Sequence, residues 1–188
     1  MLDTFESVAR NFGCRVHKLV ANLPYQIATP LVLNLLYGKL PWHLMVVTTQ
    51  LELAEKMAAG PGHPDYGAVS VLVQAAAAVA IDRRIPRSAF WPRPEVVSAI
   101  VVIRPDDARR NALPPGFAGW VHRLWSKRRK KIGGALKELT GRDDRQISEL
   151  LASSGIDPET RVEKLPPEKF VELIQALAAS EKQLNGSS

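Results

Sequence analysis

The stretch Val20-Ala21-Asn22-Leu23-Pro24-Tyr25-Gln26, "VANLPYQ", places an amide, a proline and an aromatic side chain where a run of β-type residues ends. The preceding segment, Cys14 to Ala21, is rich in apolar and β-branched residues, which predicts a buried strand that Pro24 terminates. Ligands of open α/β sheets bind outside the carboxyl ends of the strands. The stretch therefore predicts a strand and a binding site at the end of it.

Helix and strand patterns alternate on both sides of this stretch. A capping box at residues 3–6 and apolar residues at helical spacing predict a helix over residues 3–12. Thr29-Pro30 offers an N-cap and a first-turn proline for a helix that runs to Gly38. A strand over 44–49 and a helix over 50–59 follow. This order predicts an α/β fold with a parallel sheet that helices cover.

The next segments predict the other half of the sheet. After the loop at residues 60–67 we expect a helix to about Ala76, a strand to Ile85 and a final strand over 96–103. The last two strands are typical of an antiparallel hairpin at the end of a mixed sheet. Composition changes at residues 104–107, so we expect the α/β domain to cover residues 1–107.

Every pattern after Gly116 is helical. Four segments carry apolar residues at helical spacing, and these sets are Phe117, Val121 and Leu124; Ile132, Leu136 and Leu139; Ile147, Leu150 and Leu151; and Phe170, Leu173, Ile174 and Leu177. The spacing predicts a small all-α domain over residues 112–182. A disordered tail is expected over residues 183–188.

Basic residues concentrate in the helical domain. The chain has 25 Lys and Arg against 19 Asp and Glu, and residues 120–145 by themselves account for the net charge of +6. Two tryptophans, Trp120 and Trp125, are interleaved with these charges. A focused positive patch attracts nucleic acid phosphates, although a solvated helix face is the alternative interpretation. The residues expected to contact RNA are Arg123, Lys127, Arg128, Arg129, Lys130 and Lys131.

Composition excludes several classes of protein. A hydrophobic content of 46% is too high for a disordered chain, and the longest apolar run, residues 75–81, is too short to span a bilayer. Because no signal pattern is present, we expect a soluble, cytoplasmic monomer without a membrane partner. The single cysteine, Cys14, is expected to be a buried small hydrophobe, and no metal site is predicted.

The groups after the first strand suit the binding of an adenine. Asn22 supplies a carbonyl acceptor, and Pro24 favours an extended neighbour, which turns the carbonyl of Leu23 outward. These two acceptors match the two N–H donors of the adenine amine, and Tyr25 offers a face for stacking. Methylation of such an amine from a sulfonium requires positioning and no strong general base. The alternative is that these residues only cap the strand and pack on the core.

Five segments together resemble, in order and spacing, the KsgA family of small-subunit rRNA adenine dimethyltransferases. The tetrad Asn22-Leu23-Pro24-Tyr25 is moderately specific, because many amino-methyltransferases carry a relative of it. The closing segment, which begins Gly155-Ile156-Asp157-Pro158, is more particular and separates this group from the Erm-type methyltransferases. Besides the tetrad, the matching segments are "QLELAEKMAAGPGHPDYGAVSV", "SAFWPRPEVVSAIVVI", "SKRRKKIGGAL" and "GIDPETRVEKLPPEKFVEL".

The resemblance implies an enzyme that transfers methyl groups from S-adenosylmethionine to two adjacent adenosines near the 3′ end of small-subunit (16S) rRNA, in pre-30S particles during ribosome biogenesis. Asn22 would contact both the methyl donor and the amine, while Leu23 and Pro24 shape the acceptor pocket. Tyr25 would stack on the flipped adenine, and Phe90 would close its opposite face. The implied fold is the C-terminal half of a Rossmann-like class I methyltransferase sheet.

The resemblance also implies that part of the donor site is missing from this chain. A donor of this size needs a glycine-rich turn after a first strand and an acidic residue after a second strand, and the sequence has neither. In the family these parts precede the point where this chain begins, and they amount to two to three βα units, or about 80 to 100 residues. We therefore expect a fragment or a gene model that starts at an internal methionine, with an exposed apolar edge on the strand before Asn22. The alternative is a non-catalytic rRNA-binding ribosome-assembly factor.

Overall fold

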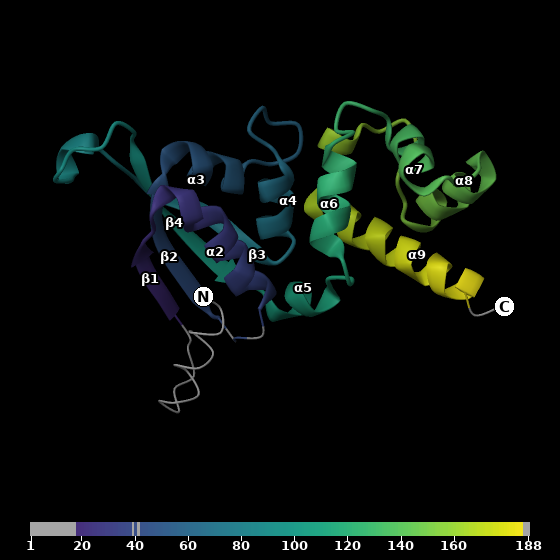
Figure 1. Cartoon of the computed structure of the whole chain (residues 1–188), viewed down its shortest axis with the longest axis horizontal. Helices are drawn as coiled ribbons and strands as arrows, with labels where there is room; N and C mark the ends of the chain where they lie inside the picture. The colour runs from purple at the N-terminus through teal and green to yellow at the C-terminus, as the bar shows by residue number, and fades with distance from the viewer. Residues whose placement is uncertain (1–17, 39, 41, 186–188) are drawn as a thin grey trace. The chain divides into compact units, whose positions relative to one another are not determined.

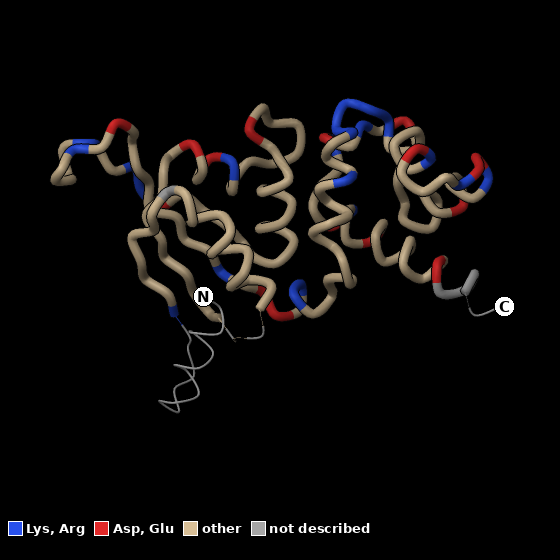
Figure 2. Tube along the Cα trace, viewed as in Figure 1, with Lys and Arg blue, Asp and Glu red and all other residues tan. Residues whose placement is uncertain are grey.

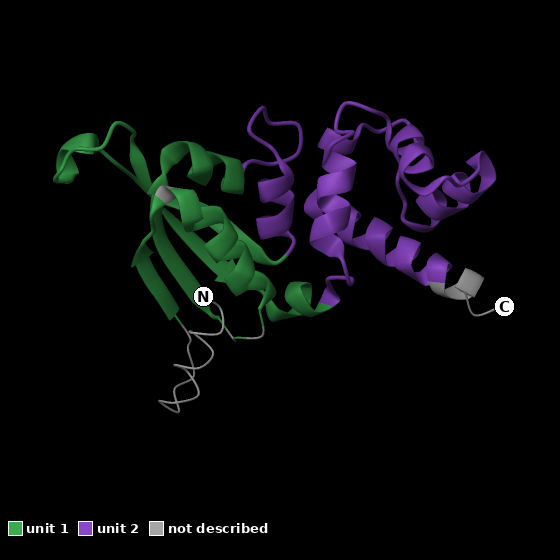
Figure 3. Ribbon diagram, viewed as in Figure 1, with its two compact units in different colours: residues 1–58, 76–111 green, residues 59–75, 112–188 purple. Residues whose placement is uncertain are grey.

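The computed structural model describes residues 18–38, 40 and 42–185, and it describes side chains as far as residue 181, apart from that of Tyr25. The helix predicted over residues 3–12, Cys14 and the first part of the predicted strand lie outside the described residues. The chain divides into two compact units, unit 1 with residues 1–58 and 76–111 and unit 2 with residues 59–75 and 112–188 (Figure 3).

Unit 1 contains a four-stranded mixed sheet. Its strands are β1 (Lys18–Asn22), β2 (Leu44–Gln50), β3 (Ala77–Ile85) and β4 (Ser98–Pro105). The strands lie in the order β1-β2-β4-β3 (Figure 1). β1 and β2 are parallel, whereas β4 runs antiparallel to both β2 and β3. The predicted α/β class, with a mixed sheet and an antiparallel last strand, is confirmed.

Two helices of unit 1, α2 (Tyr25–Tyr37) and α3 (Leu51–Ala58), pack against the sheet (Figure 1). Buried side chains of β2 at Met45, Val47 and Thr49 alternate with half-buried ones on the opposite face. On β1 the apolar side chain of Val20 is 77% exposed. One face of the sheet therefore holds the core, as the period of two residues in a strand requires.

Helix α2 begins five residues earlier than predicted. Thr29-Pro30 was expected to start it, but Pro24 is the N-cap residue, and Pro30 lies inside the helix without an N–H to donate. The reason is the position at which β1 ends. The N–H of Leu23 still donates to the carbonyl of Thr48 in β2 at 3.1 Å, and Pro24 then turns the chain directly into the helix.

Arg110 closes the C-terminal end of α2. Its side chain, which is 11% exposed, lies on the short helix α5 (Asp107–Ala112) and pairs with Asp107 at 3.0 Å. The guanidinium donates hydrogen bonds of 2.6 to 3.1 Å to the carbonyl oxygens of Leu36, Gly38 and Leu40. A cation is favourable at this position, because the last carbonyls of a helix have no partner within it.

Unit 2 is all helical apart from its loops. Its helices are α4 (Ala68–Gln74), α6 (Phe117–Trp125), α7 (Ile132–Thr140), α8 (Asp144–Ser153) and α9 (Pro167–Asn185). The apolar sets predicted for the last four are buried, except for Leu139, which is half-buried. Residues 183–185, which were predicted to be disordered, continue α9, because the sequence there consists mostly of good helix formers. Residues 186–188 lie outside the described residues.

Residues 59–75 pack within unit 2, although they were predicted to belong to the sheet domain. The hydroxyl of Tyr66 donates to the carbonyl oxygen of Leu165 at 2.8 Å, and its ring meets Trp125 edge-on with centroids 5.5 Å apart. The N–H of Gly62 donates to the carbonyl oxygen of Glu163. A buried tyrosine hydroxyl needs a partner, and the segment before α9 supplies it. The predicted domain limits, 1–107 and 112–182, otherwise stay predictions.

The described residues lack two kinds of feature. None of the helices in these ranges combines the length and the apolar character that crossing a lipid bilayer requires. The same ranges contain no cluster of three or more His, Cys, Asp or Glu side chains that could hold a metal ion.

Candidate functional site

A pocket of about 270 Å³ lies at the carboxyl end of β1. The β1–α2 junction contributes Asn22, Leu23 and Pro24, and the loop between β3 and β4 contributes the rest of the lining, which is Phe90, Trp91, Pro92 and Pro94. The structure thus brings Phe90 to the three residues with which the sequence grouped it. The volume lies just below the range of 300–1,000 Å³ typical of pockets for drug-sized ligands, so the pocket suits a smaller group.

Asn22 and Leu23 line this pocket and have polar groups that are unpaired among the described residues. Asn22 is the last residue of β1 and is exposed, and its amide makes no hydrogen bond to another described residue. The side chain of Leu23 is buried, but in the described part of the chain no hydrogen bond ends on its carbonyl oxygen. Two acceptors are therefore available where the sequence predicted them. Tyr25 begins α2 directly after Pro24, but its side chain lies outside the described residues.

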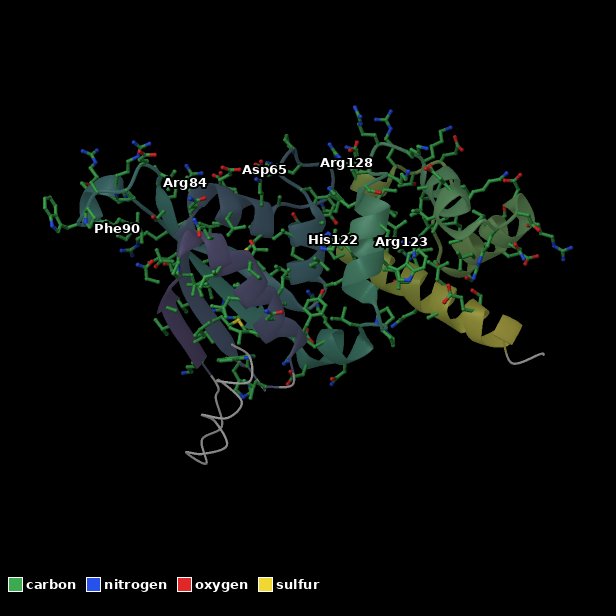
Figure 4. All side chains as sticks on the ribbon, viewed as in Figure 1. Asp65, Arg84, Phe90, His122, Arg123 and Arg128 are labelled. Atoms are coloured by element: carbon green, nitrogen blue, oxygen red, sulfur yellow. The ribbon has the colours of Figure 1, made fainter. Side chains whose placement is uncertain are left out.

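Phe90 lies on the β3–β4 arm, which we define as residues 82–97 (Figures 1 and 4). From this arm it lines the pocket. A register shift in β3 between Ile81 and Arg83 marks the base of the arm, and such bulges bend and twist a strand. Arg84 donates to Glu55 on α3 at 3.0 Å, which ties the arm to the helix layer of unit 1. Prolines 92 and 94 restrict the backbone next to Phe90. The arm therefore holds Phe90, whose side chain is half-buried, at the pocket.

The basic loop, residues 126–131, joins α6 to α7 in unit 2 (Figure 2). Lys127 and Lys130 both form ion pairs with Glu138 on α7, and Lys131 pairs with Glu159. Arg128 and Arg129 are exposed and form no ion pair or side-chain hydrogen bond with another described residue. Of the five cations in the loop, these two arginines are thus the ones that are free for an external anion.

Glu138 is the acid that pairs with two of the five cations in the basic loop. Hydrogen bonds from Lys127 and from Lys130 lower the pKa of its carboxyl to about 2, so it is ionised at neutral pH. Its charge offsets part of the positive charge that the sequence places in this loop. Sequence spacing does not show this pairing, because Glu138 lies on the next helix.

The backbone of the basic loop is held by the closing segment of the chain. The carbonyl of Arg128 accepts from the N–H of Glu163 at 3.1 Å, and that of Lys130 accepts from Val162 at 3.2 Å. The N–H of Ile132 donates to Thr160 at 2.8 Å. The basic loop and residues 160–163, which look like separate motifs in the sequence, are therefore joined by backbone hydrogen bonds. These bonds fix the backbone from which the side chains of the loop extend.

Arg123 has two contacts within unit 2. Its guanidinium lies over the ring of Trp120, 4.2 Å from the centroid, and donates to the carbonyl of Leu139 at 2.8 Å (Figure 4). Both contacts orient the side chain, and the first is a cation–π interaction. The predicted role of Arg123 in RNA binding stays a prediction.

Known proteins resemble this chain in sequence. The family described as "Ribosomal RNA adenine dimethylase" matches residues 3–179. "Ribosomal RNA small subunit methyltransferase A" of Halothermothrix orenii is 37% identical over 161 residues, which are 84% of this chain and 54% of that protein. "Probable ribosomal RNA small subunit methyltransferase A" of Thermococcus gammatolerans is 40% identical over 161 residues, 84% of this chain and 56% of that protein. The chain thus spans a little over half the length of these curated relatives.

Solved structures share the fold. The dimethyladenosine transferase from Plasmodium falciparum aligns with a TM-score of 0.76 at 21% identity, over 87% of this chain and 67% of that one. The 23S rRNA methyltransferase ErmE aligns with a TM-score of 0.57 at 22% identity, over 86% and 65% of the two chains. Together with the mixed sheet, these likenesses confirm the predicted Rossmann-like fold class.

Proposed function

We propose a function for this chain on the basis of its family. The chain belongs to the ribosomal RNA adenine dimethylase family. The proposed reaction transfers methyl groups from S-adenosylmethionine to the amines of two adjacent adenosines near the 3′ end of small-subunit rRNA. The proposed partner is this rRNA in the pre-30S particle, during ribosome biogenesis. The observation that carries the proposal is the pocket where Asn22, Leu23 and Phe90 meet.

The pocket supports this reaction through positioning. The side-chain oxygen of Asn22 and the carbonyl oxygen of Leu23 would accept the two N–H groups of the adenine amine. Phe90 would stack on one face of the base, and Tyr25 on the other. Hydrogen bonds that favour a tetrahedral nitrogen make its lone pair available, and a fixed geometry removes much of the entropic part of the barrier.

The described residues are better suited to bind the methyl acceptor, adenine, than the methyl donor, S-adenosylmethionine. S-adenosylmethionine supplies an electrophilic methyl group when bound, and Asn22 is the described residue that we propose to contact it. In the described ranges no strand is followed directly by a glycine, and the acid after β4, Asp106, accepts from the backbone N–H of Arg109 at 3.0 Å. No further residue of the described ranges is therefore assigned to the donor.

A second candidate function is rRNA binding without methyl transfer, as in an assembly factor. The basic loop favours it, because Arg128 and Arg129 are free, their backbone is fixed, and the loop belongs wholly to unit 2. Phosphate contacts of this kind require neither the pocket nor a donor.

Two measurements on the 188-residue chain distinguish these functions. The first follows labelled methyl groups from S-adenosylmethionine into small-subunit rRNA, and the second is calorimetry with S-adenosylmethionine and with rRNA separately. In a control, purine riboside, which lacks the exocyclic amine, replaces the target adenosines. Methyl transfer to the normal rRNA that is lost with this control rRNA supports the enzyme. Binding of rRNA without binding of S-adenosylmethionine supports the second candidate, and failure to bind rRNA contradicts both.

A further inference from the structure

Trp91 at the mouth of the pocket is almost entirely exposed. Its side chain is 96% accessible to solvent, although the residue lines the pocket together with Phe90. By contrast, Trp42 is buried at 2% exposure and Trp125 packs on Tyr66. Within the described ranges no aromatic or cationic side chain covers the ring of Trp91. Large aromatic side chains normally bury much of their surface, and an open indole beside a pocket offers a face on which a flat ligand can stack.

Phe90 and Trp91 line the same pocket but differ in exposure. Phe90 is half-buried, whereas the side chain of Trp91 is almost entirely open to solvent. The half-buried ring of Phe90 and the open ring of Trp91 can therefore contact different groups of a ligand. A base held against Phe90 leaves Trp91 available for a second flat group.

The charges of the β3–β4 arm favour a polyanion as that partner. The arm carries four arginines against two acids, and among the described residues only one of the four, Arg84, has an acidic partner. The exposed arginines without such a partner are Arg83, Arg87 and Arg93. Exposed arginines and an exposed indole on one segment are the combination that binds single-stranded nucleic acid, with stacking for the bases and charge for the phosphates.

We propose that Trp91 stacks on the base adjacent to the adenine in the pocket, while the free arginines of the arm contact the flanking phosphates. The inference rests on the proposed function, because it needs an adenine in the pocket. It specifies the substrate as a single strand read over at least two consecutive nucleotides. Since stacking tolerates any base, Trp91 would add affinity and orientation without selecting a sequence.

Binding of a short oligouridine RNA with one central adenosine to the 188-residue chain tests this proposal. The RNA is compared with versions in which the central residue, its 5′ neighbour or its 3′ neighbour is abasic, by fluorescence anisotropy at one salt concentration. We expect one abasic neighbour to weaken wild-type binding by about 5- to 100-fold. Trp91→Ala should weaken binding of the intact RNA to the same extent and then be insensitive to the abasic neighbour. Trp91→Phe should retain most of the affinity.

Val20→Ala is the matched control, since it removes another exposed apolar side chain of unit 1. If Trp91→Ala remains as sensitive to an abasic neighbour as the wild type, the ring contacts something else, such as a protein, and the inference is wrong. The central abasic site separates the two proposals. If the central abasic site weakens binding but neither abasic neighbour does, only the role of Trp91 is contradicted. If the central abasic site does not weaken binding, the adenine pocket itself is contradicted.

Discussion

The pocket of unit 1 and the basic loop of unit 2 consist of different kinds of residue. The pocket is lined by one amide and by apolar or aromatic residues, with no charged side chain among them. The basic loop holds five cations in six residues on a backbone fixed by residues 160–163. Base contacts carry selectivity and phosphate contacts carry position and affinity. Under the proposed function we therefore expect mutations in the pocket to change methyl transfer and mutations in the basic loop to change affinity.

The two regions also differ in the reason why their polar or charged groups have no partner among the described residues. In the pocket, Asn22 is unpaired because β1 ends with it and the chain turns away at Pro24. In the basic loop, availability depends on acids, because Glu138 and Glu159 pair with the three lysines and leave Arg128 and Arg129 free. Mutations at each region should therefore change different quantities.

The largest effect is expected from Asn22→Ala. If the amide positions the adenine amine, its loss should reduce the rate of methyl transfer by about a hundredfold, as the removal of one oriented polar group does in other enzymes. The affinity for rRNA should change by about twofold or less, since most of it comes from phosphate contacts. Initial rates of labelled methyl transfer and rRNA titrations measure the two quantities, in whichever form of the protein shows transfer.

Asn34→Ala is the control for this experiment, because Asn34 is an exposed asparagine on the helix that follows the pocket. It should leave both the rate and the affinity unchanged. Equal losses of rate and rRNA affinity in Asn22→Ala would mean that Asn22 supports the fold rather than the chemistry.

The next largest effect is expected from Arg128→Gln combined with Arg129→Gln. Loss of two free cations should weaken rRNA binding by about tenfold at low salt and reduce the slope of log K against log salt by about two. Titrations at several salt concentrations measure both quantities.

A variant with the same loss of charge is Lys137→Gln combined with Arg145→Gln. These two cations also lie in the basic segment of the sequence, but they pair with Asp144 and Glu149 at 2.8 and 2.9 Å. We expect a clearly smaller change in slope. Identical slopes for the two double variants would show that only net charge matters, and the basic loop would lose its special role.

A smaller effect of opposite sign is expected from Glu138→Gln. Removing this carboxylate releases Lys127 and Lys130, so rRNA binding should strengthen by about two- to fivefold and become more dependent on salt. Glu149→Gln, which removes an acid that pairs outside the loop, should change neither quantity. Weaker rRNA binding by Glu138→Gln would mean that the ion pairs hold the loop in its binding geometry.

The smallest effect concerns stability in acid. The pKa of Glu138 is about 2 in the folded protein, below its ordinary value of 4.5, so the carboxylate contributes stability above pH 4.5 that is lost as the pH falls toward 2. The group is exposed, and the contribution is therefore modest. Urea unfolding of the wild type and Glu138→Gln should show a difference in midpoint at pH 6 that shrinks near pH 2. A difference that does not depend on pH would exclude the ion pairs as its source.

Local patterns predicted much of the fold. The helix faces around Leu124, Leu136 and Leu173 are buried as their spacing indicates, and the strands lie within a few residues of their predicted positions. The start of α2 was wrong, because Thr29-Pro30 is a strong local signal but the end of β1 is set by its pairing with β2. The placement of residues 59–75 differed because the contacts of Tyr66 are made with residues far along the chain.

The candidate site was predicted partly from chemistry and partly from resemblance. The acceptors at Asn22 and Leu23 follow from a proline after a strand, whereas no periodicity connects them to Phe90, which the family resemblance supplied. The basic segment was visible as a run of charges. Its division into paired and free cations was not, because Glu138 and Glu159 have no special position in the sequence.

The amino-acid sequence by itself determined where the strands and helices form, which faces of the helices are apolar and which short motifs occur, because these depend on neighbouring residues and on the period of each element. Only the tertiary structure decided that Phe90 meets Asn22, that Arg128 is free while Lys127 is paired, and that Trp91 faces solvent. Exposure and ion pairing depend on groups that folding brings together from distant positions. Adjacent residues of similar type can therefore have different roles.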